Sequence, residues 1–497
     1  WCYAEYWTTQ ESYCNNTYNA YKTKLYSYLT LEANNLTISD SILKSTSEHT
    51  STVVYNPDHG DYYEYWRAAW VYVDVDIEYD MNIDDSMILG WVRNPAGVGQ
   101  GYGNVNGAHL DYDITAQNLE VLNSTLMGKR VAGQGDRNFL TKINSSGGEV
   151  DIQESWLGLY NSDGNFQIYE TNYTLSITNS TIRPTISACI DGYGCNNTYQ
   201  NAEVLIDNST VNSDIAIRQL SEVIVINSKI SGALAIYQTS DVLIFGNTEI
   251  SGSLYVDSTN TTIWNSKISG RLYTDIVNLN LHDLEKLHGI SPWNGGGDYT
   301  MIDNVTFTSW INIDGISIDF TNSSVSSSVT IYHKFVNMTN ITIDDSLIIR
   351  GGGGTYLESE LGLAYLNNVT ASYELQGGIW DLRLEDVHTT YGSGTLRAGK
   401  LWMSNSTFEK SSSNPASYSI YVSDLGDHDN PSTEDIYIYN STIRFNTTTP
   451  DENHAFLFDI DTTGDIRIID SEINATRYRT STIELKGSEV LIRNSTI

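Results

Sequence analysis

The chain has 497 residues and a formal net charge of −34, although charged residues make up only 18% of it, because Lys and Arg are scarce. A field of this sign makes nucleic acid and anionic membrane surfaces unfavourable partners. No apolar run reaches the ~18 residues that a transmembrane helix needs, so no direct membrane span is expected.

Residues 1–30 are rich in Tyr, and their apolar positions recur at steps of three and four. This spacing predicts an amphipathic helix, which we expect to cap the fold that follows. A helix that binds a partner is the alternative. The chain starts with Trp, and no charged start followed by an apolar run, as in a signal peptide, is present. We therefore expect a mature exported chain whose signal peptide has been removed.

One phrase, apolar, any, apolar, any, then Asn or Asp, recurs from residue 36 to the end of the chain. Four copies follow one another closely, at about 18 to 20 residues, which is a solenoid period. They end at Asn208, Asn227, Asn247 and Asn265. Other copies end at Asp40, Asp85, Asn123, Asn179, Asn304, Asn322, Asp345, Asn368, Asp386, Asn405, Asn440, Asp470 and Asn494.

The alternation places Val204 and Ile206 on one face of a short strand, and Ile215 and Ile217 on one face of another. Strands this short hold a core only if each coil stacks on its neighbours. The Asn or Asp then falls at a corner, where it accepts the left-handed backbone conformation and bonds its neighbours in a ladder. We expect Asn227 and Asn265 to be buried at such turns.

This repeat pattern resembles the right-handed parallel β-helix superfamily, which includes pectate lyases, polygalacturonases, phage tailspikes and many surface proteins. The resemblance implies an all-β, right-handed parallel β-helix solenoid of about twenty rungs spaced by roughly 4.8 Å. On this interpretation residues 1–30 are the cap and residues 31–497 the β-helix.

Wider gaps between copies predict loop insertions in the β-helix at residues 50–79, 93–110 and 411–434. Residues 50–79 carry a cluster of Tyr and Trp. Such a cluster packs against the side of the solenoid, stacks on sugar rings or enters a partner subunit. The chain stops at Ile497, part-way through a coil, so we expect either a natural continuation or a second subunit at that end, and self-association of isolated chains.

N-glycosylation signals, Asn-X-Ser/Thr, are abundant, and part of the excess comes from corner phrases that read Asn-Ser-Thr. Signals away from the corner register are the preferred glycan sites, and Asn260 and Asn340 in particular are expected to carry sugars. The preferred sites are Asn15, Asn35, Asn144, Asn172, Asn196, Asn260, Asn337, Asn340, Asn446 and Asn474.

The four cysteines form two local pairs, Cys2 with Cys14 and Cys189 with Cys195. An even count in an exported chain favours disulfides, and four buried thiols are the alternative. No His lies at ligand spacing from either pair, so no zinc site and no cofactor are expected.

Enzymes of the superfamily use carboxylates on an outer face, and resemblance to polygalacturonases points to Asp344, Asp345, His288 and Gly289. The match is poor, because His288 precedes the acidic pair and no Arg-apolar-Lys phrase follows. An acidic cluster before Ile436 either binds calcium or is solvated. It contains Asp424, Asp427, Asp429 and Glu434.

These observations favour a non-enzymatic, extracellular structural glycoprotein with covalent N-glycans, resembling archaeal surface-layer, filament or adhesin proteins. Its partners are further copies of itself, joined through the ends into a filament or lattice. The alternative is a β-helix that binds or cleaves polysaccharide, as a tailspike does. An open groove with two ordered carboxylates would favour an enzyme.

Overall fold

β-Strands dominate the computed structural model of the protein, and its described residues contain no helix, so the predicted all-β class is confirmed. The chain divides into two compact units, residues 1–252 and residues 253–497. The structure describes residues 8–15, 18–48, 53–56, 61–94, 108–132, 139–145, 149–160, 165–169, 174–183, 186–188, 203–212, 215–218, 221–292, 297–350, 362–372, 375–389, 394–412, 418–422, 434–447, 455–476 and 480–497.

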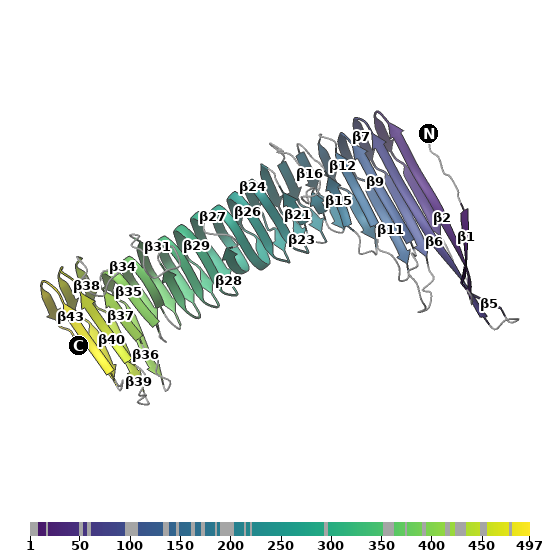
Figure 1. Ribbon diagram of the computed structural model, residues 1–497. Helices are drawn as coiled ribbons and strands as arrows, with labels where there is room; N and C mark the ends of the chain where they lie inside the picture. The colour runs from purple at the N-terminus through teal and green to yellow at the C-terminus, as the bar shows by residue number, and fades with distance from the viewer. Residues whose placement is uncertain are drawn as a thin grey trace. The chain divides into compact units, whose positions relative to one another are not determined.

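In the first unit most strands form three columns, in which each strand pairs in parallel with its equivalent one coil further along the chain (Figure 1). Column A holds β3 (Leu36–Ser39), β7 (Asp80–Asp84), β10 (Asn118–Leu122), β13 (Val150–Gln153), β16 (Thr174–Thr178), β19 (Glu203–Asp207) and β22 (Glu222–Ile226). Column B holds β4 (Ile42–Glu48), β8 (Met87–Asn94), β11 (Thr125–Ala132), β14 (Trp156–Tyr160), β17 (Thr181–Arg183), β20 (Thr210–Val211), β23 (Lys229–Ile230) and β25 (Glu249–Ile250). Column C holds β2 (Tyr18–Ala33), β6 (Asp61–Ile77), β9 (Ala108–Ala116), β12 (Phe139–Ser145), β15 (Asn165–Tyr169), β18 (Ile186–Ala188) and β21 (Ile215–Arg218). The last strand of column C, β24 (Leu234–Phe245), pairs with β21 and then continues into column A beside β22.

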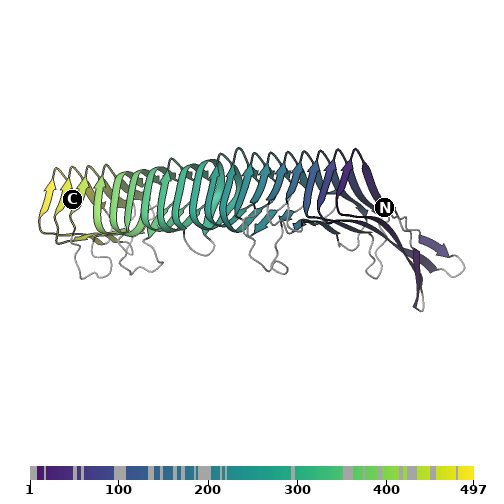
Figure 2. The same ribbon diagram turned by 90° about the horizontal axis from the view of Figure 1, so that it is seen from above.

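Strands of the second unit also pair in parallel, and several run through a corner without a break (Figure 2). They are β26 (Leu254–Trp264), β27 (Lys267–Pro292), β28 (Gly297–Phe307), β29 (Ile311–Thr321), β30 (Ser324–Val325), β31 (Val329–Ile343), β32 (Leu347–Arg350), β33 (Leu363–Ala371), β34 (Leu375–Thr389), β35 (Gly394–Ser404), β36 (Thr407–Ser412), β37 (Tyr418–Val422), β38 (Ile436–Tyr439), β39 (Thr442–Thr447), β40 (Ala455–Asp461), β41 (Ile466–Ile469), β42 (Glu472–Thr476), β43 (Thr480–Lys486) and β44 (Val490–Arg493).

The core is the stack of apolar residues that the repeat phrase places on the inner face. Val204 and Ile206 of β19 pair in register with Val223 and Val225 of β22, and all four side chains are buried. Val and Ile are stiff at χ1 and pack well on a pleated surface, so a column of them favours the strand. The predicted inward positions of residues 203–236 are therefore confirmed.

Every phrase except the one that ends at Asp345 finishes in a sharp corner with a left-handed backbone. Asn208, Asn227 and Asn265 have φ values of 44°, 49° and 45°. Asn and Asp accept this conformation better than other residues with a side chain. The side-chain amide of Asn208 donates a hydrogen bond of 2.6 Å to Oδ1 of Asn179 in the preceding coil, which is the ladder that the repeat predicts.

The corner prediction is wrong in one respect: Asn227 and Asn265 are exposed, and the buried polar residue is the Ser that follows the corner. In unit 1, Ser180, Ser209 and Ser228 stack in a second ladder. The backbone N–H of Ser180 donates to Oγ of Ser209, and that of Ser209 to Oγ of Ser228, each at 3.1 Å. The amide side chain is too polar and too long to turn inward beside this hydroxyl, so it stays in water.

The predicted helix at residues 1–30 is wrong, because β1 (Thr8–Asn15) and β2 lie there as an antiparallel pair. Tyr and Thr favour strands, and β2 has a parallel partner along most of its length in β6, so pairing overrides the helical spacing. β1 covers the free edge of β2 only over residues 18–25. The cap role of this segment stays a prediction.

The predicted insertions contain regular strands. β6 crosses most of residues 50–79, and β37 lies within residues 411–434, and both pair in parallel with neighbouring coils. Residues 95–107, which make up most of the predicted insertion at residues 93–110, lie outside the described part of the chain. Most of the aromatic residues of residues 50–79 thus lie on one long strand, β6, whose second half alternates Val with Tyr72, Asp74 and Asp76.

Register also corrects one copy of the phrase. Met338 pairs with Phe320 and with Leu366, which makes Asn340, with φ 58°, the corner of that coil instead of Asp345. Asn340 and Asp345 both follow alternating apolar residues, so the sequence alone allowed either of them to be the corner. Asp345 instead accepts a hydrogen bond of 2.7 Å from Ser328 Oγ.

Candidate functional site

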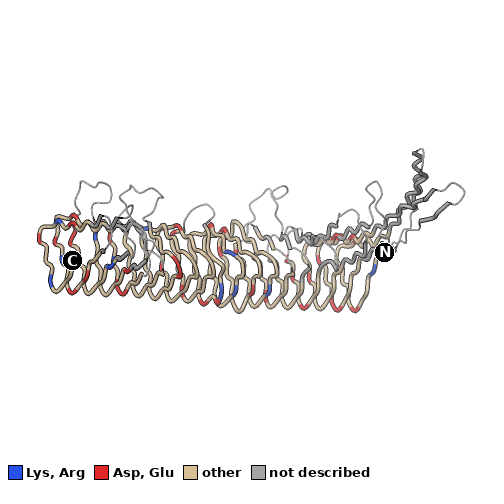
Figure 3. The backbone as a smooth tube through the Cα atoms, turned by 90° about the horizontal axis from the view of Figure 1, so that it is seen from below, with Lys and Arg blue, Asp and Glu red and all other residues tan. Residues whose placement is uncertain are grey.

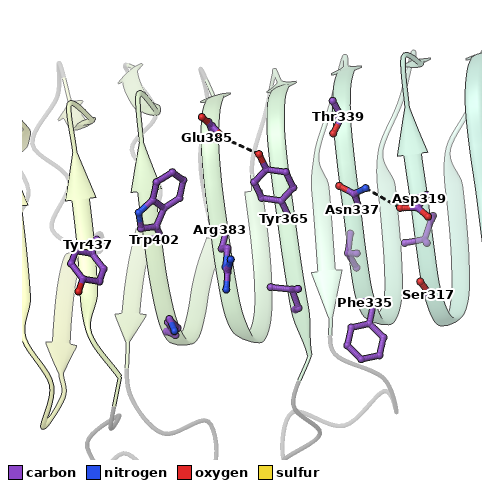
Figure 4. A pocket seen from close by; sticks show the side chains of 14 residues that line it. Ser317, Asp319, Phe335, Asn337, Thr339, Tyr365, Arg383, Glu385, Trp402 and Tyr437 are labelled. Atoms are coloured by element: carbon purple, nitrogen blue, oxygen red, sulfur yellow. Dashed lines mark hydrogen bonds between the residues drawn. The ribbon is translucent and has the colours of Figure 1, made fainter.

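A pocket of about 840 Å³ lies on the outer face of the second unit, over β29, β31, β33, β34, β35 and β38. Its volume is in the range of ligand sites. Each of these strands alternates, so that one residue faces the core and the next faces the pocket. For example, Met338 is fully buried, while Asn337 and Thr339 on either side of it line the pocket (Figure 4).

The pocket is built from rows of side chains, with one residue from each successive strand. Strand register joins the members of the central row in order, so neighbours along the row lie roughly 4.8 Å apart. The row contains Asp319, Asn337, Tyr365, Arg383, Trp402 and Tyr437. The pocket therefore extends across strands, and its length follows from the stacking of coils.

Four aromatic rings line the pocket. Tyr365, Trp402 and Tyr437 are half-buried members of the central row, and Phe335 in the adjacent row is 47% exposed. Large exposed or half-exposed aromatic side chains next to polar groups are typical of binding surfaces. Figure 4 shows these rings along the pocket on four different strands.

Two carboxylates line the pocket, and each is held by hydrogen bonds. Asp319 accepts from the amide of Asn337 and from the hydroxyl of Tyr299, both at 2.9 Å. Glu385 accepts from the hydroxyl of Tyr365 at 2.8 Å, and this bond raises the pKa of Tyr365. Burial, together with the bond to Asp319, raises the pKa of Tyr299. Both tyrosines therefore stay protonated at neutral pH, and the hydrogen bonds fix the orientations of the two carboxylates.

Each of the two basic residues of the pocket forms an ion pair with a carboxylate. Arg383 Nη2 lies 2.9 Å from Asp381, which raises the pKa of the guanidinium, and Lys400 Nζ lies 3.2 Å from Glu434. Lys and Arg are sparse along the described backbone, whereas Asp and Glu are frequent (Figure 3). The pocket therefore has no excess of positive charge to attract an anion.

The pocket carboxylates are not spaced for glycoside hydrolysis. Asp319 and Glu385 come from strands three apart in the stack, which separates them by more than about 14 Å. Glycosidases need two carboxyl groups at about 5 to 10 Å, which this arrangement does not provide.

The residues suggested by resemblance to polygalacturonases are not brought together. His288 is 3.4 Å from Thr308 Oγ1, while Asp345 is bonded to Ser328 and Ser346. Register places the coil of His288 three strands from that of Asp345, roughly 14 Å away. Asp344 and Gly289 belong to these same two coils, so His288 and Gly289 lie apart from Asp344 and Asp345.

Asp424, Asp427 and Asp429 lie outside the described residues, and Glu434 pairs with Lys400. Among the residues that the structure describes, no group of three or more His, Cys, Asp or Glu could hold a metal ion, and no helix is long and apolar enough to cross a membrane.

The predicted glycan sites are scattered over the chain. Asn35 and Asn260 are exposed, Asn474 is half-buried, and Asn337 lines the pocket. Asn340 is a ladder corner that donates to Asn322 and accepts from Asn368, each at 2.9 Å, so its choice as an off-corner site is wrong.

Several predicted glycan sites and all four cysteines cannot be placed in this way. Outside the described residues lie Asn172, Asn196, Cys2, Cys189 and Cys195, and also the side chains of Asn15, Asn144, Asn446 and Cys14. Both disulfides stay predictions.

The central row occupies the unspecified position between the two apolar residues of the repeat phrase, as in Ile436, Tyr437 and Ile438. Reading these positions down successive phrases would have found the pocket from the sequence. Comparison of the chain with family models, with curated proteins and with solved structures finds no match.

Proposed function

We propose that the protein is an exported, non-enzymatic cell-surface β-helix of the adhesin type, which binds polysaccharide in the pocket of its second unit. The observation that carries the proposal is the central row, in which three aromatic rings lie beside three polar side chains that can bond hydroxyls. Sugars present apolar ring faces and polar rims, so they are suited to such a lining.

The three parallel columns and the left-handed corner in each coil support a right-handed parallel β-helix solenoid of about twenty rungs spaced by roughly 4.8 Å. Abundant N-glycosylation signals and scarce Lys and Arg support an extracellular location. Assembly of copies through their ends into a filament or surface layer stays a prediction from the sequence.

A linear ligand suits the pocket better than a compact one. Six strands each contribute one residue to the central row, which therefore extends over roughly 24 Å. A polysaccharide lying across the strands contacts several members of this row at once, and its affinity is the sum of many modest contacts. A small metabolite would leave most of the row unused.

The ligand class is a neutral glycan. Arg383 and Lys400 are each paired with a carboxylate, and Asp319 and Glu385 add negative charge to the same surface. This surface would repel an acidic polysaccharide electrostatically, most strongly at low salt. Sugar hydroxyls, in contrast, donate well to the two ordered carboxylates.

Binding of linear hexasaccharides of glucose, mannose, galactose and galacturonate to the full chain, made without glycosylation, tests the proposal by calorimetry. Trp402→Ala is expected to weaken binding of a neutral hexasaccharide at least about tenfold, which corresponds to about 1.4 kcal/mol. Trp264→Ala is the matched control, because Trp264 is 43% exposed in the same unit and does not line the pocket. Absence of binding to every neutral glycan, or equal loss in both variants, refutes the proposal.

A further inference from the structure

An N-glycosylation signal lies inside the pocket. Asn337, Met338 and Thr339 form the signal on β31, and the alternation of the strand turns its two essential residues, Asn337 and Thr339, to the pocket side. Met338 between them is fully buried in the core. Figure 4 shows both side chains between Asp319 and Tyr365.

The hydrogen bonding of Asn337 is compatible with a sugar on its amide nitrogen. Nδ2 donates one bond, of 2.9 Å, to Oδ1 of Asp319. An Asn amide nitrogen carries two hydrogens. Glycosylation joins Nδ2 to the anomeric carbon of a diphosphate-linked oligosaccharide, breaks the bond from that carbon to the diphosphate, and releases one amide proton. The remaining N–H can keep the bond to Asp319.

A sugar on this nitrogen starts in the middle of the binding surface. Asn337 pairs in register with Tyr365, so that ring is about 5 Å along the row, and Trp402 is about 14 Å along it. A glycan of a few sugars attached at Asn337 therefore overlaps the positions of a bound polysaccharide.

We propose that an N-linked glycan on Asn337 occupies the pocket and excludes free polysaccharide, so that glycosylation at this one site sets whether the molecule binds. This inference rests on the proposed function of the pocket. A tethered ligand acts at an effective concentration of the order of mM, which a free polysaccharide must exceed in order to compete. Steric exclusion by the covalent bond adds to this effect.

The test compares the full chain made with and without N-glycosylation. Mass spectrometry first measures glycan occupancy at Asn337, and calorimetry then measures affinity for the neutral hexasaccharide that the unglycosylated chain binds best. Thr339→Ala removes the signal and keeps the Asn337 amide, whereas Thr339→Ser keeps the signal. Asn260→Gln removes an exposed signal outside the pocket.

Occupancy at Asn337, with glycosylation weakening the affinity at least tenfold in wild type, Thr339→Ser and Asn260→Gln but not in Thr339→Ala, is the expected result. Each glycosylated chain is compared with the same chain made without glycosylation, so a direct contribution of the Thr339 side chain to binding cancels. A bare Asn337 in the glycosylating host, or equal affinities with and without its glycan, overturns the inference and leaves the proposed function standing. If no unglycosylated chain binds any glycan, the proposed function fails, and this inference fails with it.

Discussion

Replacing Ser209 with Ala tests how much the buried hydroxyl ladder stabilises the stack of coils. The Ser209 side chain is 3% exposed, and its hydroxyl lies 2.6 Å from the carbonyl oxygen of Asp207 and 3.2 Å from that of Ile177. The same oxygen accepts the backbone N–H of Ser180. The substitution therefore removes a donor and leaves a buried N–H without a partner.

The expected loss follows from these contacts. An unsatisfied buried amide costs about 1–3 kcal/mol, and the lost hydroxyl bond adds about 1 kcal/mol, so Ser209→Ala should lower the free energy of unfolding by about 2–4 kcal/mol. Ser209→Thr should cost less than about 1 kcal/mol, because Thr248 makes the equivalent contacts two coils further on.

Denaturant unfolding of unit 1 and hydrogen exchange of the Ser180 amide measure the effect. Ser231→Ala is the matched control, since Ser231 is exposed in a neighbouring coil. The reasoning is refuted if Ser209→Ala is as stable as Ser231→Ala and the Ser180 amide keeps its protection. In that case the hydroxyls follow the backbone geometry without stabilising it.

Three further substitutions probe the same architecture, each by denaturant unfolding against wild type. His333 is fully buried, and burial lowers its pKa from 6.5 to about 4. Between these two pH values the unfolded chain binds more protons than the folded chain, so the free energy of unfolding falls as the pH drops from 6.5 to about 4. His333→Leu should remove about 3 kcal/mol of this pH dependence, and an unchanged stability difference between about pH 7 and pH 4 would contradict the prediction. Gly315→Ala should lower the free energy of unfolding by about 1–3 kcal/mol at every pH, because the new Cβ overlaps the carbonyl oxygen of Gly297 and lies 2.7 Å from Nε2 of His333. A variant as stable as wild type would show that the coils shift to make room. Asn227→Val should cost about 1–2 kcal/mol more than Asn227→Gly, since φ is 49° at this corner, and equal losses would contradict the strain.

The repeat phrase made most of the fold predictable. Two-residue alternation places Val204, Ile206, Val223 and Val225 inward, and no helical arrangement satisfies that period. The short strands need neighbours on both sides, which leads to parallel stacking before any coordinates are known.

The misses have local causes. Residues 8–33 carry both a helical spacing and strand-forming Tyr and Thr, and only the pairing of β2 with β6 decides between the two. Asn340 and Asp345 both follow apolar alternations, and the register with Phe320 selects Asn340. Local sequence does not contain either pairing, so it could not settle these choices.

The pocket was hidden for a different reason. Its residues occupy the unspecified position of the phrase, where Asp319, Tyr365 and Trp402 have no common chemistry to form a motif. They become neighbours only when coils of unequal length are brought into register. A motif search within one stretch of chain therefore misses them, whereas aligning the phrases of successive coils recovers the row.

Hydroxyl-radical footprinting of the unglycosylated full chain, with and without the neutral hexasaccharide that it binds best, tests the central claim most directly. Oxidation of Phe335, Tyr365, Trp402 and Tyr437 should slow together on binding, although these residues are far apart in the sequence, because they line one pocket. Trp264 and Trp310, which are exposed elsewhere in the same unit, should oxidise as before. Protection of the two control tryptophans, or binding with no protection of the four pocket aromatics, would contradict the account.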